Sequence, residues 1–121
     1  MPAEIRLIIF NEVEVLSALT EYRRQRNEPL PSSYNVKLTI RGEPKIQVTL
    51  VIVPEKDEMP VKVVFEREEL AAALIMYCIG RKIPLPATGV SKTIQLFGDN
   101  IALQILKNIP QEQMEALSDL L

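Results

Sequence analysis

Two stretches of the chain decide its fold, FNEVEVLSALTEYRRQRNEPLPSSYNVK at residues 10–37 and FEREELAAALIMYCIGRKIPLPATGVSK at residues 65–92. Offset by 55 residues they align without a gap, and ten of the 28 aligned pairs are identical. About two identities would be expected by chance at ordinary residue frequencies. The identical pairs are Phe10/Phe65, Glu14/Glu69, Ala18/Ala73, Leu19/Leu74, Tyr22/Tyr77, Arg26/Arg81, Pro29/Pro84, Leu30/Leu85, Pro31/Pro86 and Lys37/Lys92. The alignment predicts an internal duplication.

Each copy is predicted to form a strand, a helix and a hairpin. In the first copy, alternation of Ile5, Leu7 and Ile9 favours a strand. Asn11 followed by Glu14 is a capping box that begins a helix, which is expected to end near Arg26 because a proline follows. Residues 36–41 and 45–53 alternate in polarity around a glycine and form the hairpin. The matching elements of the second copy are expected at residues 61–65, 66–81, 93–97 and 101–106.

These elements predict an α+β fold in one domain, residues 1–121. We expect a tandem β-α-β-β duplication with pseudo-repeats 1–56 and 57–109, followed by a C-terminal helix over residues 110–121. In the first hairpin Lys37, Thr39 and Arg41 share one side and apolar residues the other, which is typical of a sheet with one solvated face. The prediction is therefore a mostly antiparallel sheet with two helices on one face.

The two helices differ on the side that faces away from the sheet. Thr20, Glu21, Arg23 and Arg24 of the first helix are replaced by Ile75, Met76, Cys78 and Ile79 in the second. A helix that is apolar all round must be covered on a second side. The cover is either the C-terminal helix, through Met114, Leu117 and Leu120, or another protein molecule. The expected protein-binding residues are Ile75, Met76, Ile79, Met114, Leu117 and Leu120.

Composition argues against most catalytic chemistry. The chain contains no histidine and a single cysteine, so the commonest general base and the usual zinc sites are missing. We expect a protein that is not an enzyme and has no cofactor or metal. The net charge of −2 gives no broad attraction to nucleic acid or to a membrane. No signal pattern or membrane-spanning stretch is evident, and the lone cysteine favours a reducing, cytoplasmic location.

The surplus apolar surface favours a non-catalytic protein-binding adaptor or regulatory module that binds a protein partner, a second copy of itself in a homodimer, or both. The order of elements after the first strand, the small size and the pI of about 5.2 are similar to those of the acidic dimeric chaperones of bacterial secretion systems. That resemblance implies a chaperone-like form of protein binding.

Two alternatives stay open at this point. A sensor could bind a small anionic ligand between the repeats, through Arg23, Arg24, Arg26, Lys37, Arg81 and Lys92. A weaker alternative is nucleic-acid contact through the patch at residues 23–26, for which the chain offers few aromatic stacking partners.

Overall fold

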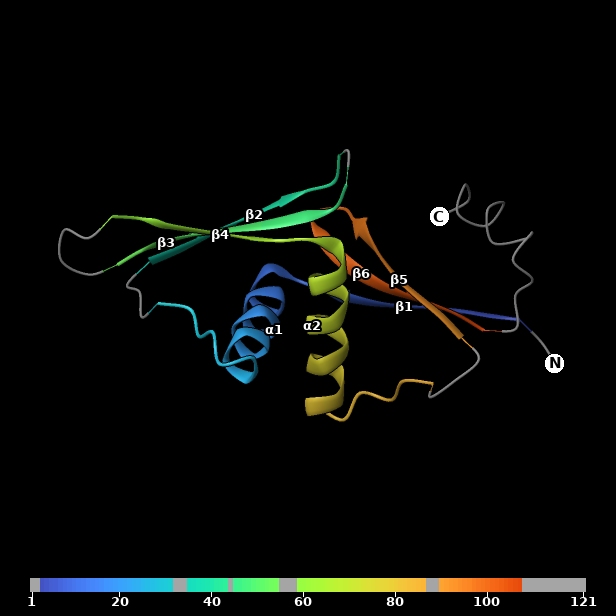
Figure 1. Cartoon of the computed structure of the whole chain (residues 1–121). Helices are drawn as coiled ribbons and strands as arrows, with labels where there is room; N and C mark the ends of the chain where they lie inside the picture. Colours follow the sequence, from blue (N-terminus) through green and yellow to red (C-terminus); the bar gives the residue numbers. More distant parts are fainter. Residues whose placement is uncertain (1–2, 32–34, 44, 55–58, 87–89, 108–121) are drawn as a thin grey trace.

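A computed structural model describes residues 3–31, 35–43, 45–54, 59–86 and 90–107, with two helices and six strands among them (Figure 1). The elements are β1 (Glu4–Phe10), α1 (Glu12–Gln25), β2 (Asn35–Arg41), β3 (Gln47–Val53), β4 (Val61–Phe65), α2 (Arg67–Gly80), β5 (Val90–Phe97) and β6 (Asn100–Lys107). Their order is β-α-β-β followed by β-α-β-β, as the repeat predicts. The C-terminal helix expected at residues 110–121 lies outside the described residues.

The strands form two separate antiparallel sheets of three strands, so the prediction of one shared sheet is wrong. One sheet has the order β2-β3-β4 and the other the order β1-β6-β5. Each hairpin therefore takes its third strand from the opposite half of the chain: Leu50 of β3 lies between Leu38 and Val63, and Leu103 of β6 lies between Ile94 and Ile8. A hairpin of two strands alone is only marginally stable in water, and this exchange gives each one a third strand.

Both helices lie on the same side of the two sheets and pack against each other, as Figure 1 shows. Buried residues from both halves form one core between the helices and the inward faces of the sheets. The rings of Phe10 and Tyr77, from opposite halves, meet edge to face with centroids 5.9 Å apart. The shared core binds the halves into a single hydrophobic unit.

The helix α1 begins at a capping box, and the two helices end in matching ways. The backbone N–H of Glu14 donates a hydrogen bond of 2.9 Å to the Asn11 side chain, and the backbone N–H of Asn11 donates one of 3.0 Å to the Glu14 carboxylate. These two bonds confirm the predicted capping box. At the C-terminal end of α1 the backbone N–H of Glu28 donates a hydrogen bond to the carbonyl oxygen of Arg23. At the end of α2 the N–H of Ile83 donates one to the carbonyl oxygen of Cys78, and in each case the acceptor lies five residues earlier in the chain. These bonds are typical of a Schellman end.

The residue that closes each of these helix ends has a left-handed backbone, with φ of 59° at Asn27 and 57° at Lys82. Asparagine tolerates this region, whereas lysine is strained in it. We predict that Lys82→Gly raises the free energy of unfolding by about 1 kcal/mol and the Tm by a few degrees. Thermal melts monitored by circular dichroism check the prediction, with Asn27→Gly as the matched control that gives a smaller gain. A loss of stability in Lys82→Gly would contradict it.

In two strands, β1 and β5, the side that faces the core is not the side that the sequence pattern predicts. In β1 the core-facing residues are Ile8 and Phe10, while Ile5 and Ile9 point to the opposite side and are 41% and 42% exposed. In β5 the core residue is Ile94, so Lys92 shares its side of the sheet, whereas Lys37 is exposed on the outer side of β2. The identity of Lys37 and Lys92 in the alignment therefore does not correspond to equivalent positions, because β5 is shifted by one residue.

Candidate functional site

The outward side of α2 carries an apolar stripe made of Ala72, Ile75, Met76 and Ile79, called the α2 stripe below. These positions follow the spacing i, i+3, i+4 and i+7, so they share one side of the helix. Ile79 is 66% exposed, while Ile75 and Met76 are partly buried and pack against the edge of the core. The structure thus covers two of the three predicted α2 residues in part and leaves the third open to solvent.

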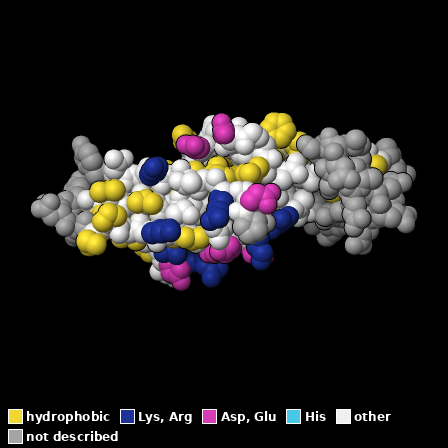
Figure 2. Space-filling view, turned by 90° about the horizontal axis from the view of Figure 1, so that it is seen from above, with side chains coloured by type: hydrophobic (Ala, Val, Ile, Leu, Met, Phe, Trp, Pro, Cys, Tyr) yellow, Lys and Arg dark blue, Asp and Glu magenta, His cyan; other side chains and the backbone are white. Residues whose placement is uncertain are grey.

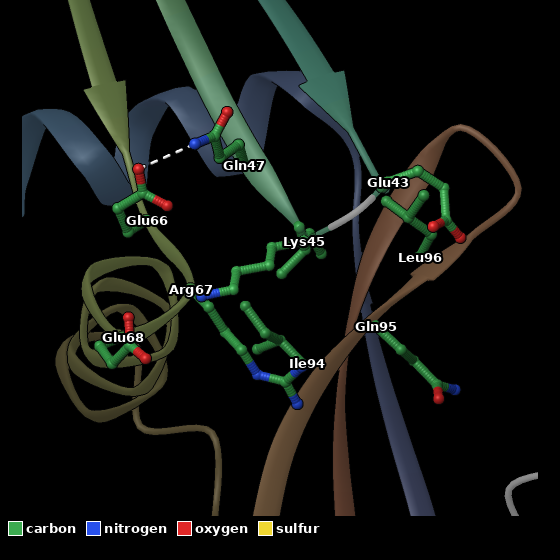
Figure 3. A pocket seen from close by; sticks show the side chains of 11 residues that line it. Glu43, Lys45, Gln47, Glu66, Arg67, Glu68, Ile94, Gln95 and Leu96 are labelled. Atoms are coloured by element: carbon green, nitrogen blue, oxygen red, sulfur yellow. Dashed lines mark hydrogen bonds between the residues drawn. The ribbon is translucent and has the colours of Figure 1, made fainter.

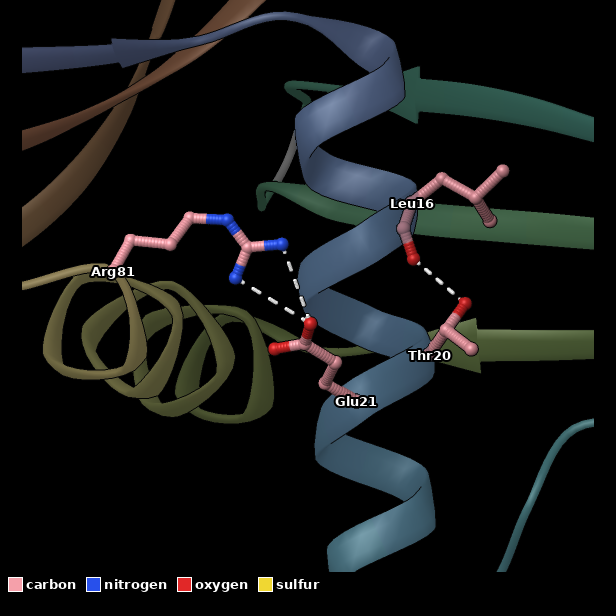
Figure 4. A network of polar contacts seen from close by, with 4 residues as sticks. All are labelled: Leu16, Thr20, Glu21 and Arg81. Carbon is pink, nitrogen blue, oxygen red and sulfur yellow. Dashed lines mark hydrogen bonds and ion pairs between the residues drawn. The ribbon is translucent and has the colours of Figure 1, made fainter.

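The equivalent side of α1 is polar. The residues that match the α2 stripe are Ser17, Thr20, Glu21 and Arg24, and with Val13 and Leu16 they line a shallow hollow of about 370 Å³. The Thr20 hydroxyl donates a hydrogen bond of 2.8 Å to the Leu16 carbonyl oxygen, as Figure 4 shows. This difference between the helices agrees with the sequence comparison. The other expected protein-binding residues, Met114, Leu117 and Leu120, lie outside the described residues.

Two of the six expected anion-binding cations, Arg81 and Arg26, lie over tyrosine rings at the ends of the two helices. The Arg81 guanidinium donates to the Glu21 carboxylate at 3.3 and 3.4 Å (Figure 4) and lies over the Tyr77 ring at 3.9 Å. Its repeat counterpart, Arg26, lies over the Tyr22 ring at 5.3 Å. The two contacts with tyrosine rings are cation–π pairs, and the Arg81 contact with Glu21 is an ion pair between the two helices.

The other cations lie at different places. Arg23 forms an ion pair with Glu28 at 3.4 Å. Arg24 lines the α1 hollow, Lys37 points outward from β2, and Lys92 lies on the core-facing side of β5. Arg81 of α2 therefore contacts α1 through its ion pair with Glu21. Lys37 and Lys92 lie on different sides of their sheets, so the six cations do not gather at one anion-binding site.

A larger cleft, of about 860 Å³, lies where the β2–β3 hairpin meets the start of α2 and the edge of β5. The hairpin passes so close to β5 that a Cβ at Gly42 would overlap the Leu96 side chain. Figure 3 shows Lys45 and Arg67 reaching into this cleft from different walls, and Arg67 donates a hydrogen bond to Thr93. Sequence reasoning missed the cleft, and Gly42 is the one residue whose type signals the close approach.

The charges in this cleft largely balance. Three carboxylates, Glu43, Glu66 and Glu68, line it beside the cations Lys45 and Arg67. Glu66 accepts a hydrogen bond of 2.8 Å from the Gln47 amide, drawn as a dashed line in Figure 3. A cleft with more carboxylates than cations does not favour an anionic ligand.

Cys78 is fully buried in α2. Burial raises the pKa of its thiol above the ordinary value, and the guanidinium of Arg6 offsets part of the rise. Arg6 itself donates a hydrogen bond of 2.6 Å to the Pro84 carbonyl oxygen. A buried thiol with a raised pKa is a poor nucleophile, and Cys78 belongs to the core.

Within the described part of the chain, no helix is long and apolar enough to cross a membrane. No group of three or more His, Cys, Asp or Glu side chains gathers as metal ligands among those same residues. Comparisons of the chain with protein-family models, with curated proteins and with solved structures find no match.

Proposed function

We propose that this protein is a non-catalytic protein-binding module, a cytoplasmic adaptor or regulator that docks a protein partner on the α2 stripe. The observation that supports the proposal is the exposure of Ile79, which is 66% open to solvent on a stripe without a charged residue. The repeat provides an internal comparison, because α1 has Thr20, Glu21 and Arg24 where α2 has Ile75, Met76 and Ile79. The chain thus tolerates polar residues at this side of a helix but has apolar ones in α2.

Covering the α2 stripe would contribute to binding through apolar area removed from water. At about 25 cal/mol per Å², burial of the remaining exposed surface of Ile75, Met76 and Ile79 supplies roughly 2–4 kcal/mol. That is enough for an anchor within a larger interface but not for a complete one. The partner must therefore contact further residues around the stripe.

A second copy of this chain is the partner that the stripe itself suggests first. An isologous contact places the same patch of both subunits against each other, which requires a patch that is complementary to itself. The α2 stripe meets this requirement, since it is uncharged and has a small residue, Ala72, that allows close approach of a second helix. Self-association through α2 would match the expected homodimeric, chaperone-like module.

We predict that Ile79→Glu weakens this association at least about tenfold, because a carboxylate would have to be buried in the interface. Because Ile79 is mostly exposed, the variant should keep its fold. Light scattering after size exclusion, over a range of concentrations, should show the wild type rising from the 13.7 kDa of one chain towards twice that mass. The variant should stay at the mass of one chain.

Arg24→Glu is the matched control, because Arg24 occupies the position in α1 that Ile79 occupies in α2. It should leave the mass in solution unchanged. A wild-type chain that remains monomeric at several hundred micromolar would contradict the proposed homodimer. If partners captured from the native host also bind Ile79→Glu as well as they bind the wild type, docking on the α2 stripe is disproved.

The alternative of a small anionic ligand between the repeats has less support. Arg81 pairs with Glu21, and Lys37 and Lys92 lie on opposite sides of their sheets. Nucleic-acid contact through residues 23–26 is weakened in the same way, since Arg23 pairs with Glu28 and Arg26 stacks on Tyr22. Stabilisation in thermal melts by nucleotides or organic acids would favour the ligand alternative over protein binding.

A further inference from the structure

The side of the β1-β6-β5 sheet that faces away from the helices is mostly apolar on its two strands β1 and β6, with Gln104 as the buried polar residue among them. In β6 the residues Ile101, Leu103 and Ile105 belong to the core, so the alternate residues of this strand point to the other side. We call that other side the β6 outer face. Its residues on β6 and β1 are Ala102, Gln104, Leu106, Ile5, Leu7 and Ile9. None of these side chains is charged. Thr93 and Gln95 of β5 lie at the edge of the face, where the Arg67 guanidinium of α2 donates a hydrogen bond to the Thr93 hydroxyl.

The corresponding face of the β2-β3-β4 sheet is exposed to solvent and carries charged side chains. Lys37 and Arg41 of β2 and Lys62 of β4 point outward there. Figure 2 looks onto this side of the molecule and shows charged side chains spread over its middle. The repeat allows the two outer faces to be compared position by position: Leu7 of β1 occupies the position that Lys62 has in β4. One outer face is thus solvated, while its counterpart is apolar.

The centre of the β6 outer face is buried, although α1 and α2 both lie on the other side of the sheet. Ala102 is 0% exposed and Leu106 is 6% exposed, yet neither belongs to the core that the helices cover. Ile5 and Ile9 beside them remain 41% and 42% exposed. An apolar sheet face of this kind is normally packed against a further layer.

The chain itself offers a segment of the right chemistry and position. Fourteen residues, 108–121, follow Lys107, and β6 is the middle strand of the sheet, so they start from the centre of the face. As a helix from Pro110, this segment places Met114, Leu117 and Leu120 on one side and Glu112, Glu115 and Asp119 on the opposite side. Twelve helical residues span about 18 Å, which is shorter than a strand of seven residues at about 23 Å. The segment therefore fits along the sheet.

The route to the α2 stripe is less direct. To reach the outward side of α2, the segment would have to pass around β1 or β5 and then across the helix layer, with only two residues between Lys107 and Pro110. The helix-facing side of the sheet is already filled by the core. The β6 outer face can be reached by a single reversal of the chain, and connections of two to six residues are the usual length for such reversals.

We propose that residues 108–121 dock on the β6 outer face of their own chain, with Met114, Leu117 and Leu120 packed against Ala102, Leu106 and the exposed isoleucines of β1. The tether favours this occupant over a second copy, because it holds the segment at a high effective concentration. The proposal is independent of binding at the α2 stripe. It also leaves that stripe open to a partner, since the only unduplicated segment is engaged elsewhere.

Methyl NOE spectroscopy on the full chain, labelled at Ala, Ile, Leu and Met methyl groups, tests the proposal directly. We expect contacts from the Met114 and Leu117 methyl groups to Ala102 and to Ile5 or Ile9. A sample that mixes labelled with unlabelled chains should show that these contacts arise within one chain. Contacts seen only between chains, contacts to Ile75 or Ile79 in place of the sheet, or no contacts at all would each overturn the proposal.

A pair of double variants gives a second readout. Leu117→Gln with Leu120→Gln removes apolar contact and should lower the Tm by about 5–10 °C while shifting the Ala102 methyl resonance. Glu112→Gln with Glu115→Gln alters the opposite side of the segment in the same way and should leave both the Tm and that resonance nearly unchanged. If the two double variants behave alike, the segment does not dock through its apolar side and the proposal fails.

Discussion

Phe10→Ala is expected to lower the free energy of unfolding by about 3–5 kcal/mol, a large share of the stability of a domain of this size. Phe10 is 1% exposed and ends β1 at the point where the chain enters α1. Truncation removes a buried ring and leaves a cavity. It also removes the edge-to-face contact with Tyr77, which is worth about 0.5–1.5 kcal/mol in such pairs. Urea unfolding followed by circular dichroism measures the loss.

Two further phenylalanines supply the comparison for this prediction. Phe65 is the repeat counterpart of Phe10 and is 0% exposed, so Phe65→Ala should cost a similar amount. Phe97 is 45% exposed at the end of β5, and Phe97→Ala should cost only about 1 kcal/mol. If Phe10→Ala loses no more stability than Phe97→Ala, then Phe10 does not join the two halves in one core.

Local features of the fold were predictable because short-range physics determines them. The capping box of Asn11 and Glu14 and the proline after the helix predicted the bounds of α1 within a residue or two. Alternation in β2 placed Leu38 towards the core and Lys37 towards solvent, as the structure confirms. The strands predicted at residues 93–97 and 101–106 placed the tip of the second hairpin at Gly98, where φ is 62°, a region that glycine adopts freely; β6 begins at Asn100, one residue earlier than predicted.

Strand pairing between distant parts of the chain could not be predicted in the same way. Whether β1 pairs with its own hairpin or with that of the other half changes no local pattern, since the repeats are equivalent. In β1 the two sides are both rich in apolar residues, so alternation did not reveal that Ile8 and Phe10 face the core. The gap-free alignment of residues 10–37 with 65–92 pairs Lys37 with Lys92, although β5 is shifted by one residue relative to β2 and these side chains lie on different sides of their strands.

The candidate site was predictable in part for the same reason. Comparing the two helices position by position identified Ile79 as a surplus apolar residue, and it is exposed. The same comparison applied to β1 and β4 would have aligned Leu7 with Lys62. This replacement of a lysine by a leucine would have indicated that the β6 outer face is apolar. The cleft beside Lys45 and Arg67 depends on how two sheets meet, which no local pattern encodes.

The exchange of first strands leads to the second large expected effect: neither half of the chain should fold alone. A fragment of residues 1–56 keeps the β2–β3 hairpin but loses β4, and its β1 has no partner because β6 belongs to the other fragment. The fragment of residues 57–121 suffers the same losses. Each would expose one face of a hairpin and one face of a helix, and a chain of about 60 residues buries too little surface to offset this.

The two fragments mixed in equal amounts should regain the secondary structure and the cooperative urea transition of the whole chain, because each supplies the strand that the other lacks. Circular dichroism and proton NMR dispersion, recorded for each fragment alone at low micromolar concentration and for the mixture, make the measurement. Phe10→Ala in the first fragment should weaken the reconstituted complex by at least about a hundredfold, since the ring joins both halves. A fragment that is folded and monomeric alone would mean that each hairpin pairs with its own first strand. The two sheets would then each be made of one half, and the exchange of β1 and β4 would be wrong.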